Sequence, residues 1–438
     1  MNEVAIHWFR RDLRLEDNTA LYYALKSGYP VLPIFIFDVD ILDDLKDGNT
    51  LTKDNRVLFI YKELEYLKNK LIALGSDLNI YYGKPSEVWK QILTTNSVKK
   101  VFTNHDYEPY AINRDAQFAD FLKMQSIEFY SFKDQVIFEK KEVVKDDGTP
   151  YHVFTPYSKK WKFTLQNDSL ASYPSESLFA SFLKVSSVQH LISLDSMGFL
   201  QSNVVFPDRI VSDNLINHYQ ENRDYPSILG TSRLSLHLRF GTISIRKLAR
   251  QALASNNQIF LNELIWREFY MMILYHYPRV VSQSFKPQYD KIQWRNNIDE
   301  FAAWCEGRTG YPIVDAGMRE LNTTGFMHNR VRMIVASFLT KHLLIDWRWG
   351  EAYFAKKLLD YELSSNNGGW QWAAGTGVDA APYFRVFNPA LQTLKFDKDL
   401  KYIKKWVPEY SELTYVKPIV EHTFARNRCL EVYKAALG

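Results

Sequence analysis

The sequence predicts two structural regions: an N-terminal α/β region with a doubly wound parallel sheet of five strands, and a larger, all-helical C-terminal region. Over residues 1–132, short apolar runs alternate with helical patterns, as in parallel sheets whose strands are joined by helices. From residue 205 onward, the apolar positions recur at helical intervals only. A chain of 438 residues has room for two or three domains. We therefore expect domains at 1–132 and 205–438, joined by an interdomain connection at 133–204.

The five strands are expected at the short apolar runs, which are residues 4–9, 31–37, 78–82, 100–103 and 127–132. A helix is expected between the second and third strands, because apolar residues recur there at intervals of four and three and Gly75 follows as a stop. Asp17 is expected to cap a helix over residues 18–26. The region lacks a G-x-G-x-x-G motif, so it does not support a dinucleotide in the usual Rossmann position.

The later regions differ in pattern. In the connection, Asp147-Gly148 is a turn signal between two short β-like runs, and residues 169–202 are rich in serine with weak periodicity. Helices are expected in the C-terminal region at 212–222, 244–255, 258–276, 313–322, 329–344 and 351–361. A helical domain of this kind has crevices in which a flat cofactor could be buried.

Composition excludes several classes of protein. The net charge of +4 is only mildly basic, so a local basic face matters more for nucleic-acid binding than the total. Cys305 and Cys429 are the only cysteines, which excludes a disulfide framework and a four-cysteine iron–sulfur cluster and fits a reducing compartment. No apolar run is long enough to span a membrane, and no signal-peptide pattern begins the chain. We expect a cytoplasmic monomer without a membrane segment or a metal site.

The segment 360–372 carries an unusual set of side chains. It combines two acids, three amides, two glycines and two tryptophans. Paired glycines let a backbone approach another group closely. Trp370 and Trp372 flank Gln371, so on a helix they would point about 200° apart into different surroundings. A helix start with two core tryptophans explains this segment equally well from the residues alone.

Two further segments combine polar and aromatic groups. On the predicted helix 258–276, Glu263, Trp266, Arg267 and Tyr270 share one face, which a plain salt-bridged surface helix would not usually present. The segment 230–235, Gly-Thr-Ser-Arg-Leu-Ser, offers hydroxyls and backbone N–H groups that suit a phosphate. A capped helix start is the structural alternative for it.

These motifs resemble the photolyase/cryptochrome family, and most closely the class I cyclobutane pyrimidine dimer (CPD) DNA photolyases. The likeness rests on Asn-Asn-Gly-Gly-Trp-Gln-Trp at 366–372, Asp-Ala-Ala-Pro-Tyr-Phe-Arg at 379–385 and Phe-Asn-Pro at 387–389. It runs from His7 to about Arg426 and is strongest from Gly230 to Asn388. The opening segment 7–18, which would otherwise be an ordinary solvated loop, resembles the family's N-terminal signature.

The resemblance implies a helical FAD-binding domain with non-covalent FAD, active as reduced FADH−. Segment 230–235 would hold the diphosphate, Arg332 and Asp360 would form a buried ion pair beside the flavin ring, and Asn366 would face flavin N5. The residues that it places on the cofactor are Tyr219, Thr231, Ser232, Arg233, Leu234, Ser235, Arg267, Arg332, Asp360, Tyr361, Glu362 and Asn366.

The resemblance also implies the substrate, which is DNA containing pyrimidine dimers, and the residues that contact it. Glu263 would hydrogen-bond the dimer and Trp266 would pack on it. The implied DNA-binding residues are Arg223, Glu263, Trp266, Arg267, Tyr270, Asn329, Arg330 and Gln392. The implied catalytic residues are Glu263, Asn366, Met333, Trp266 and Trp372. Trp370, Trp347 and Trp294 match the family's photoreduction triad, from the flavin outward; three core tryptophans are the structural alternative.

The expected activity is that of a deoxyribodipyrimidine photo-lyase. An electron from excited reduced FAD would split the cyclobutane ring of a flipped-out dimer, and base flipping is itself a general property attributed to photolyases. A cryptochrome-type light sensor and a (6-4) photolyase share this fold and stay open as alternatives. Asn329 and Met333 stand where (6-4) photolyases carry extra histidines, which favours CPD substrates. Asn366 stands where plant cryptochromes carry an acid, which favours a repair enzyme.

The resemblance does not support a folate antenna. Ala111 and Val281 stand where folate-binding members have glutamate and lysine. A different second chromophore, such as a deazaflavin or another flavin, or an empty pocket stays open.

Overall fold

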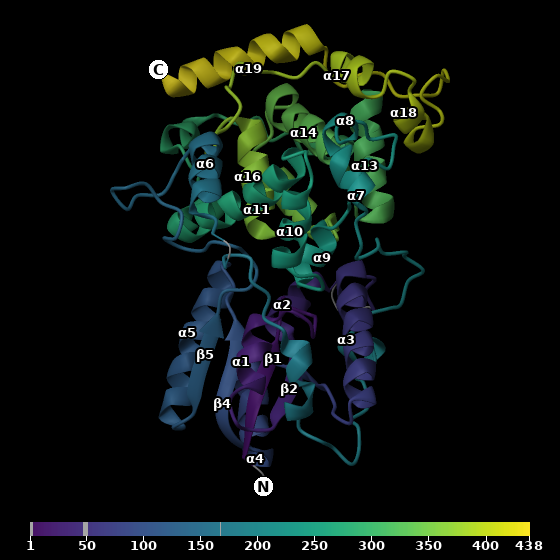
Figure 1. Ribbon diagram of the computed structural model, residues 1–438. Helices are drawn as coiled ribbons and strands as arrows, with labels where there is room; N and C mark the ends of the chain where they lie inside the picture. The colour runs from purple at the N-terminus through teal and green to yellow at the C-terminus, as the bar shows by residue number, and fades with distance from the viewer. Residues whose placement is uncertain (1–2, 47–50, 167) are drawn as a thin grey trace. The chain divides into compact units, whose positions relative to one another are not determined.

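The chain folds into two compact units that are not contiguous in sequence. A computed structural model describes residues 3–46, 51–166 and 168–438 (Figure 1). The first unit, here the sheet unit, groups residues 1–139, 165–210 and 233–251; the second, the helical unit, groups 140–164, 211–232 and 252–438. This division differs from the three predicted domains, because 140–164 joins the helical unit and 165–210 the sheet unit.

The sheet unit is built on five parallel strands in the order β3-β2-β1-β4-β5. The strands are β1 (Glu3–Phe9), β2 (Val31–Asp38), β3 (Asn79–Gly83), β4 (Ser97–Asn104) and β5 (Glu128–Phe132). In register, Trp8 of β1 pairs with Ile34 of β2. The central strand β1 and its neighbour β2 are buried along nearly their whole length, as expected for a parallel sheet covered on both faces. The doubly wound α/β prediction is therefore confirmed.

Helices connect the strands and complete the sheet unit. They are α1 (Thr19–Leu25), α2 (Val39–Leu42), η1 (Asp43–Leu45), α3 (Asn55–Ala73), α4 (Pro85–Thr95), α5 (Pro109–Met124), η2 (Ser175–Ser181), η3 (Asp195–Met197) and α9 (Ser235–Phe240). Helix α3 ends before Gly75, which has a positive φ of 74°, as the pattern predicts. The predicted cap of α1 is wrong by one residue. Asn18 accepts the N–H of Leu21, whereas Asp17 has a φ of 49° and binds Arg246 instead.

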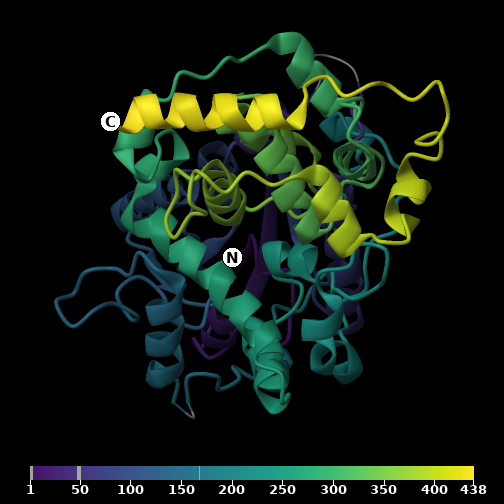
Figure 2. The same ribbon diagram turned by 90° about the horizontal axis from the view of Figure 1, so that it is seen from above.

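The helical unit contains the remaining helices apart from α10 (Ile245–Ala254), which crosses the boundary between the units. They are α6 (Phe154–Thr164), α7 (Asp213–Asn217), α8 (Tyr219–Asn222), α11 (Ile259–His276), η4 (Pro278–Val281), η5 (Pro287–Lys291), α12 (Ile298–Cys305), α13 (Pro312–Thr324), α14 (Asn329–Ser337), η6 (Phe338–His342), α15 (Trp347–Lys357), α16 (Leu363–Ala374), α17 (Pro389–Phe396), α18 (Lys401–Trp406) and α19 (His422–Leu437). Figure 2 shows α19 in yellow, and it packs on η5 and η6.

Three predicted helices differ from the observed ones. The helix expected at 212–222 is broken into α7 and α8 at His218. The helix expected at 329–344 ends as α-helix at Ser337 and continues as the π-helical turn η6. The helix expected at 351–361 begins earlier and ends at Lys357, which leaves Asp360 and Tyr361 outside it. The β-like runs beside Asp147-Gly148 form no strand, since residues 133–153 contain neither helix nor strand.

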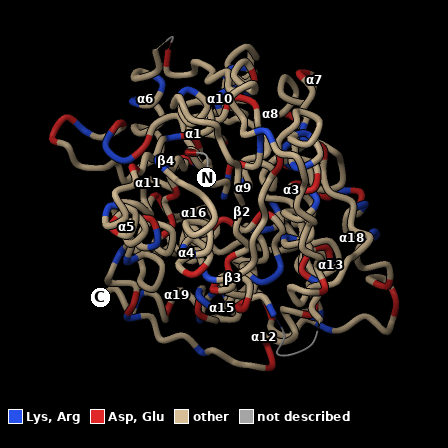
Figure 3. Tube along the Cα trace, turned by 90° about the horizontal axis from the view of Figure 1, so that it is seen from below, with Lys and Arg blue, Asp and Glu red and all other residues tan. Residues whose placement is uncertain are grey.

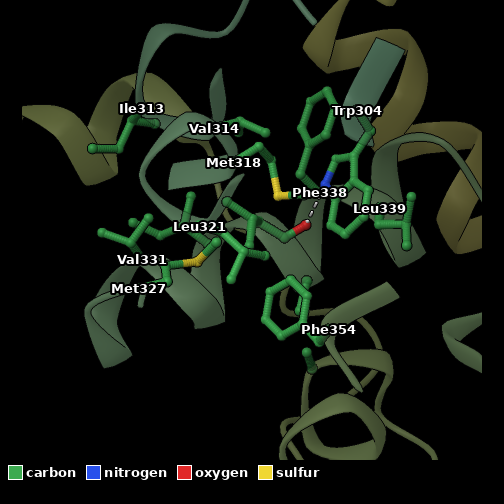
Figure 4. Packing of buried hydrophobic residues seen from close by; sticks show 14 of the residues in the cluster. Trp304, Ile313, Val314, Met318, Leu321, Met327, Val331, Phe338, Leu339 and Phe354 are labelled. Carbon is green, nitrogen blue, oxygen red and sulfur yellow. Dashed lines mark hydrogen bonds between the residues drawn. The ribbon is translucent and has the colours of Figure 1, made fainter. Parts of the chain in front are cut away.

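A large apolar cluster holds the helical unit together (Figure 4). It gathers buried side chains from α12 to α16, among them Trp304, Met318, Val331 and Phe354. The Trp304 indole N–H donates to the Val335 carbonyl oxygen at 3.1 Å, so the polar atom of this buried ring is satisfied. Acidic and basic residues are interspersed along the trace of both units (Figure 3). Within the described residues, no helix combines the length and apolarity that crossing a membrane requires.

Candidate active site

Helix α11 presents the face that its sequence pattern predicts. Glu263, Trp266 and Tyr270 are half-buried, whereas Ile265 and Phe269 on the opposite side are buried in the core. Arg267 is also half-buried. The carboxyl, indole, guanidinium and phenol groups therefore lie along one partly accessible surface of the helix.

The Glu263 carboxyl lies beside a guanidinium. Arg223, which caps α8, donates from Nη1 to Glu263 Oε1 at 2.5 Å. Burial raises the pKa of the Glu263 carboxyl, and the nearby charge of Arg223 opposes that rise. The Glu263 carboxyl can donate a hydrogen bond only when it is protonated, which requires a raised pKa. The effect of burial is in this direction.

Trp266 is packed on one face by an aromatic ring. The Phe154 ring stacks on it with centroids 3.8 Å apart and planes 6° apart. Tyr270 lies against Trp266 at a tilt of 34°, with centroids 5.5 Å apart. The Tyr270 ring in turn lies directly on the backbone of α16, because a Cβ at Gly368 would come within 2.2 Å of its Cδ1. The close approach that the paired glycines predict thus occurs at Gly368.

Helix α16 begins with its own acidic cap. The Glu362 carboxylate accepts the backbone N–H of Ser365 at 3.0 Å, so this predicted cofactor residue also caps the helix. One turn later, Asn366 Nδ2 donates to Glu351 Oε1 at 2.8 Å and to the Glu351 carbonyl oxygen at 3.1 Å. Burial raises the pKa of the Glu351 carboxyl. Glu351 therefore fixes the amide of Asn366 with its nitrogen toward α15.

The predicted ion pair beside α16 is present. Arg332 Nη2 donates to both carboxylate oxygens of Asp360, at 3.1 and 2.9 Å, and Arg332 Nε donates to the Met327 carbonyl oxygen. The Asp360 side chain is only 5% exposed, so its charge is paired as burial demands. Tyr361 follows directly and is half-buried.

Helix α14 begins with two of the predicted DNA-binding residues. Asn329 is exposed, and Arg330 pairs with Asp224 at 2.7 Å while its guanidinium lies 4.3 Å from the centre of the Phe396 ring. Met333 is half-buried, with its sulfur 3.7 Å from Arg330 Nη1. Gln392 lies on α17, one turn before Phe396. The ion pair places Arg330 near Arg223, since Asp224 is the next residue in the chain.

The predicted diphosphate segment has a constrained backbone. A Cβ at Gly230 would lie 2.6 Å from the Asn222 carbonyl oxygen, and Arg233 adopts a left-handed φ of 54°. Thr231 and Ser232 belong to the helical unit, whereas Arg233, Leu234 and Ser235 belong to the sheet unit. Tyr219 is half-buried in α8 and contacts the Phe260 ring of α11 edge-on. The cofactor roles of these residues stay predictions.

The three tryptophans of the predicted electron route belong to one packed region. Trp347 and Trp370 are buried in the large apolar cluster, and Trp294 packs against it half-buried. A Cβ at Gly350, one turn after Trp347, would lie 2.1 Å from the Trp370 ring, so α15 and α16 meet closely at the Trp370 indole. Trp372 is half-buried and packs against the same cluster as Trp370, so the prediction that helical spacing separates them into different surroundings is wrong.

Sequence reasoning missed several residues that shape this site. Glu351, Asp224 and Phe154 each contact a predicted functional residue, and none carries a motif of its own. Phe154 was assigned to the interdomain connection. The apparent polarity of α16 is partly structural, because Asn367 and Gln371 are buried and donate to the Val280 carbonyl oxygen.

Two family descriptions match the sequence. Residues 5–175 match the family described as DNA photolyase, and residues 260–414 match the one described as the FAD binding domain of DNA photolyase. The chain belongs to the DNA photolyase family. The resemblance to photolyases and the FAD cofactor predicted from it are confirmed at the level of the family.

Relatives and solved structures of photolyases resemble this chain along its whole length. It is 37% identical to the deoxyribodipyrimidine photo-lyase of Halobacterium salinarum, over 99% of each chain. A bacterial class III photolyase from Agrobacterium tumefaciens superposes with a TM-score of 0.86 at 32% identity, over 100% of this chain and 98% of that one. An archaeal photolyase from Sulfolobus tokodaii, solved with two FAD molecules, superposes with a TM-score of 0.81 at 35% identity. The match covers 99% of this chain and 100% of that one.

In this photolyase-family chain, two positions bear on whether a folate could bind as a second chromophore. Ala111 is buried in α5, and Val281 is 40% exposed at the end of η4. Neither side chain can form a charged hydrogen bond. Within the described residues, no group of three or more His, Cys, Asp or Glu side chains is placed to hold a metal ion.

Proposed function

We propose that the protein repairs cyclobutane pyrimidine dimers in DNA by light-driven electron transfer, as a deoxyribodipyrimidine photo-lyase. The observation that carries the proposal is the half-buried surface of α11. There the Trp266 indole offers a ring for stacking, next to Glu263, whose pKa is raised by burial. An aromatic platform beside a hydrogen-bond donor fits a flipped pyrimidine dimer, which offers ring faces and carbonyl oxygens.

FAD fits the chemistry of the residues present. Asn262 Oδ1, next to Glu263 on α11, is a buried acceptor without a donor in the part of the chain that the structure describes. A ligand rich in hydroxyl and N–H groups can satisfy such an atom. In the helical unit, Asp360, Arg332, Asn366, Thr231 and Ser232 are the residues proposed to hold FAD. When bound and reduced, FAD supplies the electron that light excites.

The protein side chains supply binding and charge stabilisation. Trp266 stacks on the dimer, and Arg223, Arg267 and Arg330 contact the DNA phosphates. Protonated Glu263 donates a hydrogen bond to a dimer carbonyl, on which negative charge develops once the electron arrives. Met333 and Trp372 line the lesion site. The ring-splitting step needs no protein nucleophile, so positioning is the main task of these residues.

The test is repair of a dimer-containing oligonucleotide by the purified protein, in blue or near-ultraviolet light and in the dark. Repair in light alone is expected, and FAD should be released intact when the protein is denatured. A light sensor of this fold would bind FAD without repairing DNA. A (6-4) photolyase would repair (6-4) photoproducts and leave cyclobutane dimers intact.

We also propose that the protein is a monomer and lies in the cytoplasm. Light scattering can check the oligomeric state, and cell fractionation can check the location.

Binding of damaged DNA should weaken as salt rises, because arginine–phosphate contacts release counterions. Arg330→Ala is expected to reduce the slope of log K against log salt by roughly 1. Asp224→Asn is the control and should strengthen DNA binding, because Asp224 pairs with Arg330 and competes with phosphate for it. Titrations at several salt concentrations measure both. An unchanged slope in Arg330→Ala would place the DNA contact elsewhere.

Glu351 should slow the air oxidation of bound, reduced FAD, because it holds the amide of Asn366 in place. Because Glu351 holds the Asn366 nitrogen, the amide oxygen is left to accept a hydrogen bond from flavin N5–H. Glu351→Leu removes the side-chain hydrogen bond and leaves only the bond to the backbone carbonyl oxygen of residue 351, so the amide is held less firmly. Air oxidation of reduced FAD is then expected to become about fivefold faster, the worth of one hydrogen bond. Glu351→Gln retains an oxygen acceptor and is the matched control. Flavin absorbance after mixing with air measures the rate; equal rates in all three proteins would exclude this role.

A further inference from the structure

We propose that Phe154, the first residue of helix α6, is a positioning residue for lesion recognition. It fixes the plane of the Trp266 indole and leaves the opposite face of that ring for the pyrimidine dimer. This inference rests on the function proposed above. It assigns a role in the site to a segment, residues 140–164, that the sequence pattern places in a connection.

The geometry of the two rings supports the assignment. Phe154 and Trp266 are nearly parallel, with centroids 3.8 Å apart and planes at 6°. A fully overlapped stack is less common between aromatic side chains than offset or edge-on contacts. Phe269 meets the same indole edge-on at 77°, and Tyr270 meets it at a tilt of 34°. Phe154 therefore covers one face of Trp266, while the tryptophan as a whole stays half-buried.

Phe154 is itself held in place from two directions. Its backbone N–H donates to Asp379 Oδ2 at 3.0 Å, and Asp379 has a left-handed φ of 44°. The helix that follows is anchored to α11 by Trp161, whose indole N–H donates to the buried Glu268 carboxylate at 2.5 Å. Tyr157 packs on Phe269 with ring centroids 5.1 Å apart. Trp266 and Glu268 are both on α11, so Phe154 is fixed relative to the ring that it covers.

A fixed indole recognises a flat ligand at lower entropic cost. An unsupported, partly exposed tryptophan samples several rotamers, and ordering it on binding costs conformational entropy. A ring already stacked on Phe154 has lost this freedom before DNA arrives. The benefit is specific to a ligand that stacks on Trp266, which a flipped dimer does and undamaged duplex DNA does not.

The test compares affinities for one oligonucleotide with and without a cyclobutane dimer. In Phe154→Ala, the affinity for the dimer is expected to fall about tenfold, near the upper end for an aromatic pair, while the affinity for undamaged DNA changes less than about twofold. The repair rate at saturating DNA should change less than the affinity. Phe154→Tyr keeps the ring and should restore the preference for the dimer. Phe154→Leu, with a smaller change in volume, should lie between the two.

The matched control is Phe163→Ala at the far end of the same helix, where the side chain is 83% exposed. It should leave both affinities unchanged. An unchanged preference for the dimer in both Phe154→Ala and Phe154→Leu overturns the proposal. So does a parallel loss of both affinities, because that would indicate a general structural role. A wild-type protein without any preference for dimer DNA overturns the proposed function itself, and this inference with it.

Discussion

Replacing Trp294 with phenylalanine is expected to slow light-driven reduction of the bound, oxidised FAD by about tenfold or more, because the last step of the electron route is lost. An indole can give up an electron and refill from a neighbouring indole, so three tryptophans in contact with one packed core provide successive steps. Trp370 and Trp347 are almost fully buried at the close contact of α16 with α15, whereas Trp294 is half-buried and packs against the same cluster. This order of burial fits a route that ends near solvent.

The experiment separates photoreduction from repair. The Trp294→Phe protein, reduced chemically beforehand, should repair dimers at the wild-type rate. Transient absorption should show that the long-lived tryptophan radical has disappeared. Trp406→Phe, another half-buried tryptophan that packs against the same cluster, is the matched control and should photoreduce normally. Normal photoreduction in Trp294→Phe would remove this residue from the route.

Replacing Glu263 with alanine is expected to lower the quantum yield of repair several-fold, with a smaller change in lesion affinity. A donor aimed at the charge of the dimer radical anion contributes after the electron arrives and little before. Burial raises the pKa of Glu263, and the charge of Arg223 opposes the rise. A DNA phosphate that takes over Arg223 would weaken this opposition and favour the protonated, donating form.

The pH dependence follows from the protonated form. The yield should be highest below the raised pKa of Glu263 and should fall as the pH rises through it, because the ionised carboxylate cannot donate. Glu263→Gln always carries a donor and should flatten this pH dependence. Laser-flash repair yields across the pH range measure both variants. An unchanged yield in Glu263→Ala would refute the role.

Periodicity was sufficient to predict the sheet and the polar and aromatic face of α11. All five strands were expected within a few residues of their observed bounds. The buried strands β1 and β2 are continuous apolar runs, and the other three are short runs between helical patterns. The face of α11 also follows from helical spacing. The same spacing predicted different surroundings for Trp370 and Trp372, whereas both tryptophans pack in or against one cluster. The family, the fold class and the FAD cofactor, predicted through the resemblance, are confirmed.

The wrong helix cap and the missed site residues depend on contacts between segments that are far apart in the sequence. Asp17 has the chemistry of a cap, but its carboxylate is used by Arg246 and Ser244, more than two hundred residues away. Asn366 could be assigned to the flavin from its motif, whereas its partner Glu351 stands fifteen residues away on another helix. The stack of Phe154 on Trp266 joins segments more than a hundred residues apart, and no local pattern encodes it.

The discontinuity of the sheet unit also governs how the protein can be made. Arg246 pairs with Asp17 and Asp134 in the buried interior of this unit, and Phe182 and Phe199, both buried, come from its middle segment. A nascent chain therefore cannot finish this unit on the ribosome until residue 251 has emerged, which is more than half of the 438 residues. A recombinant fragment cut at residue 132 would keep every strand but lose these partners. It should expose apolar surface, bind a hydrophobic dye and aggregate, so the unit has to be expressed with its later segments.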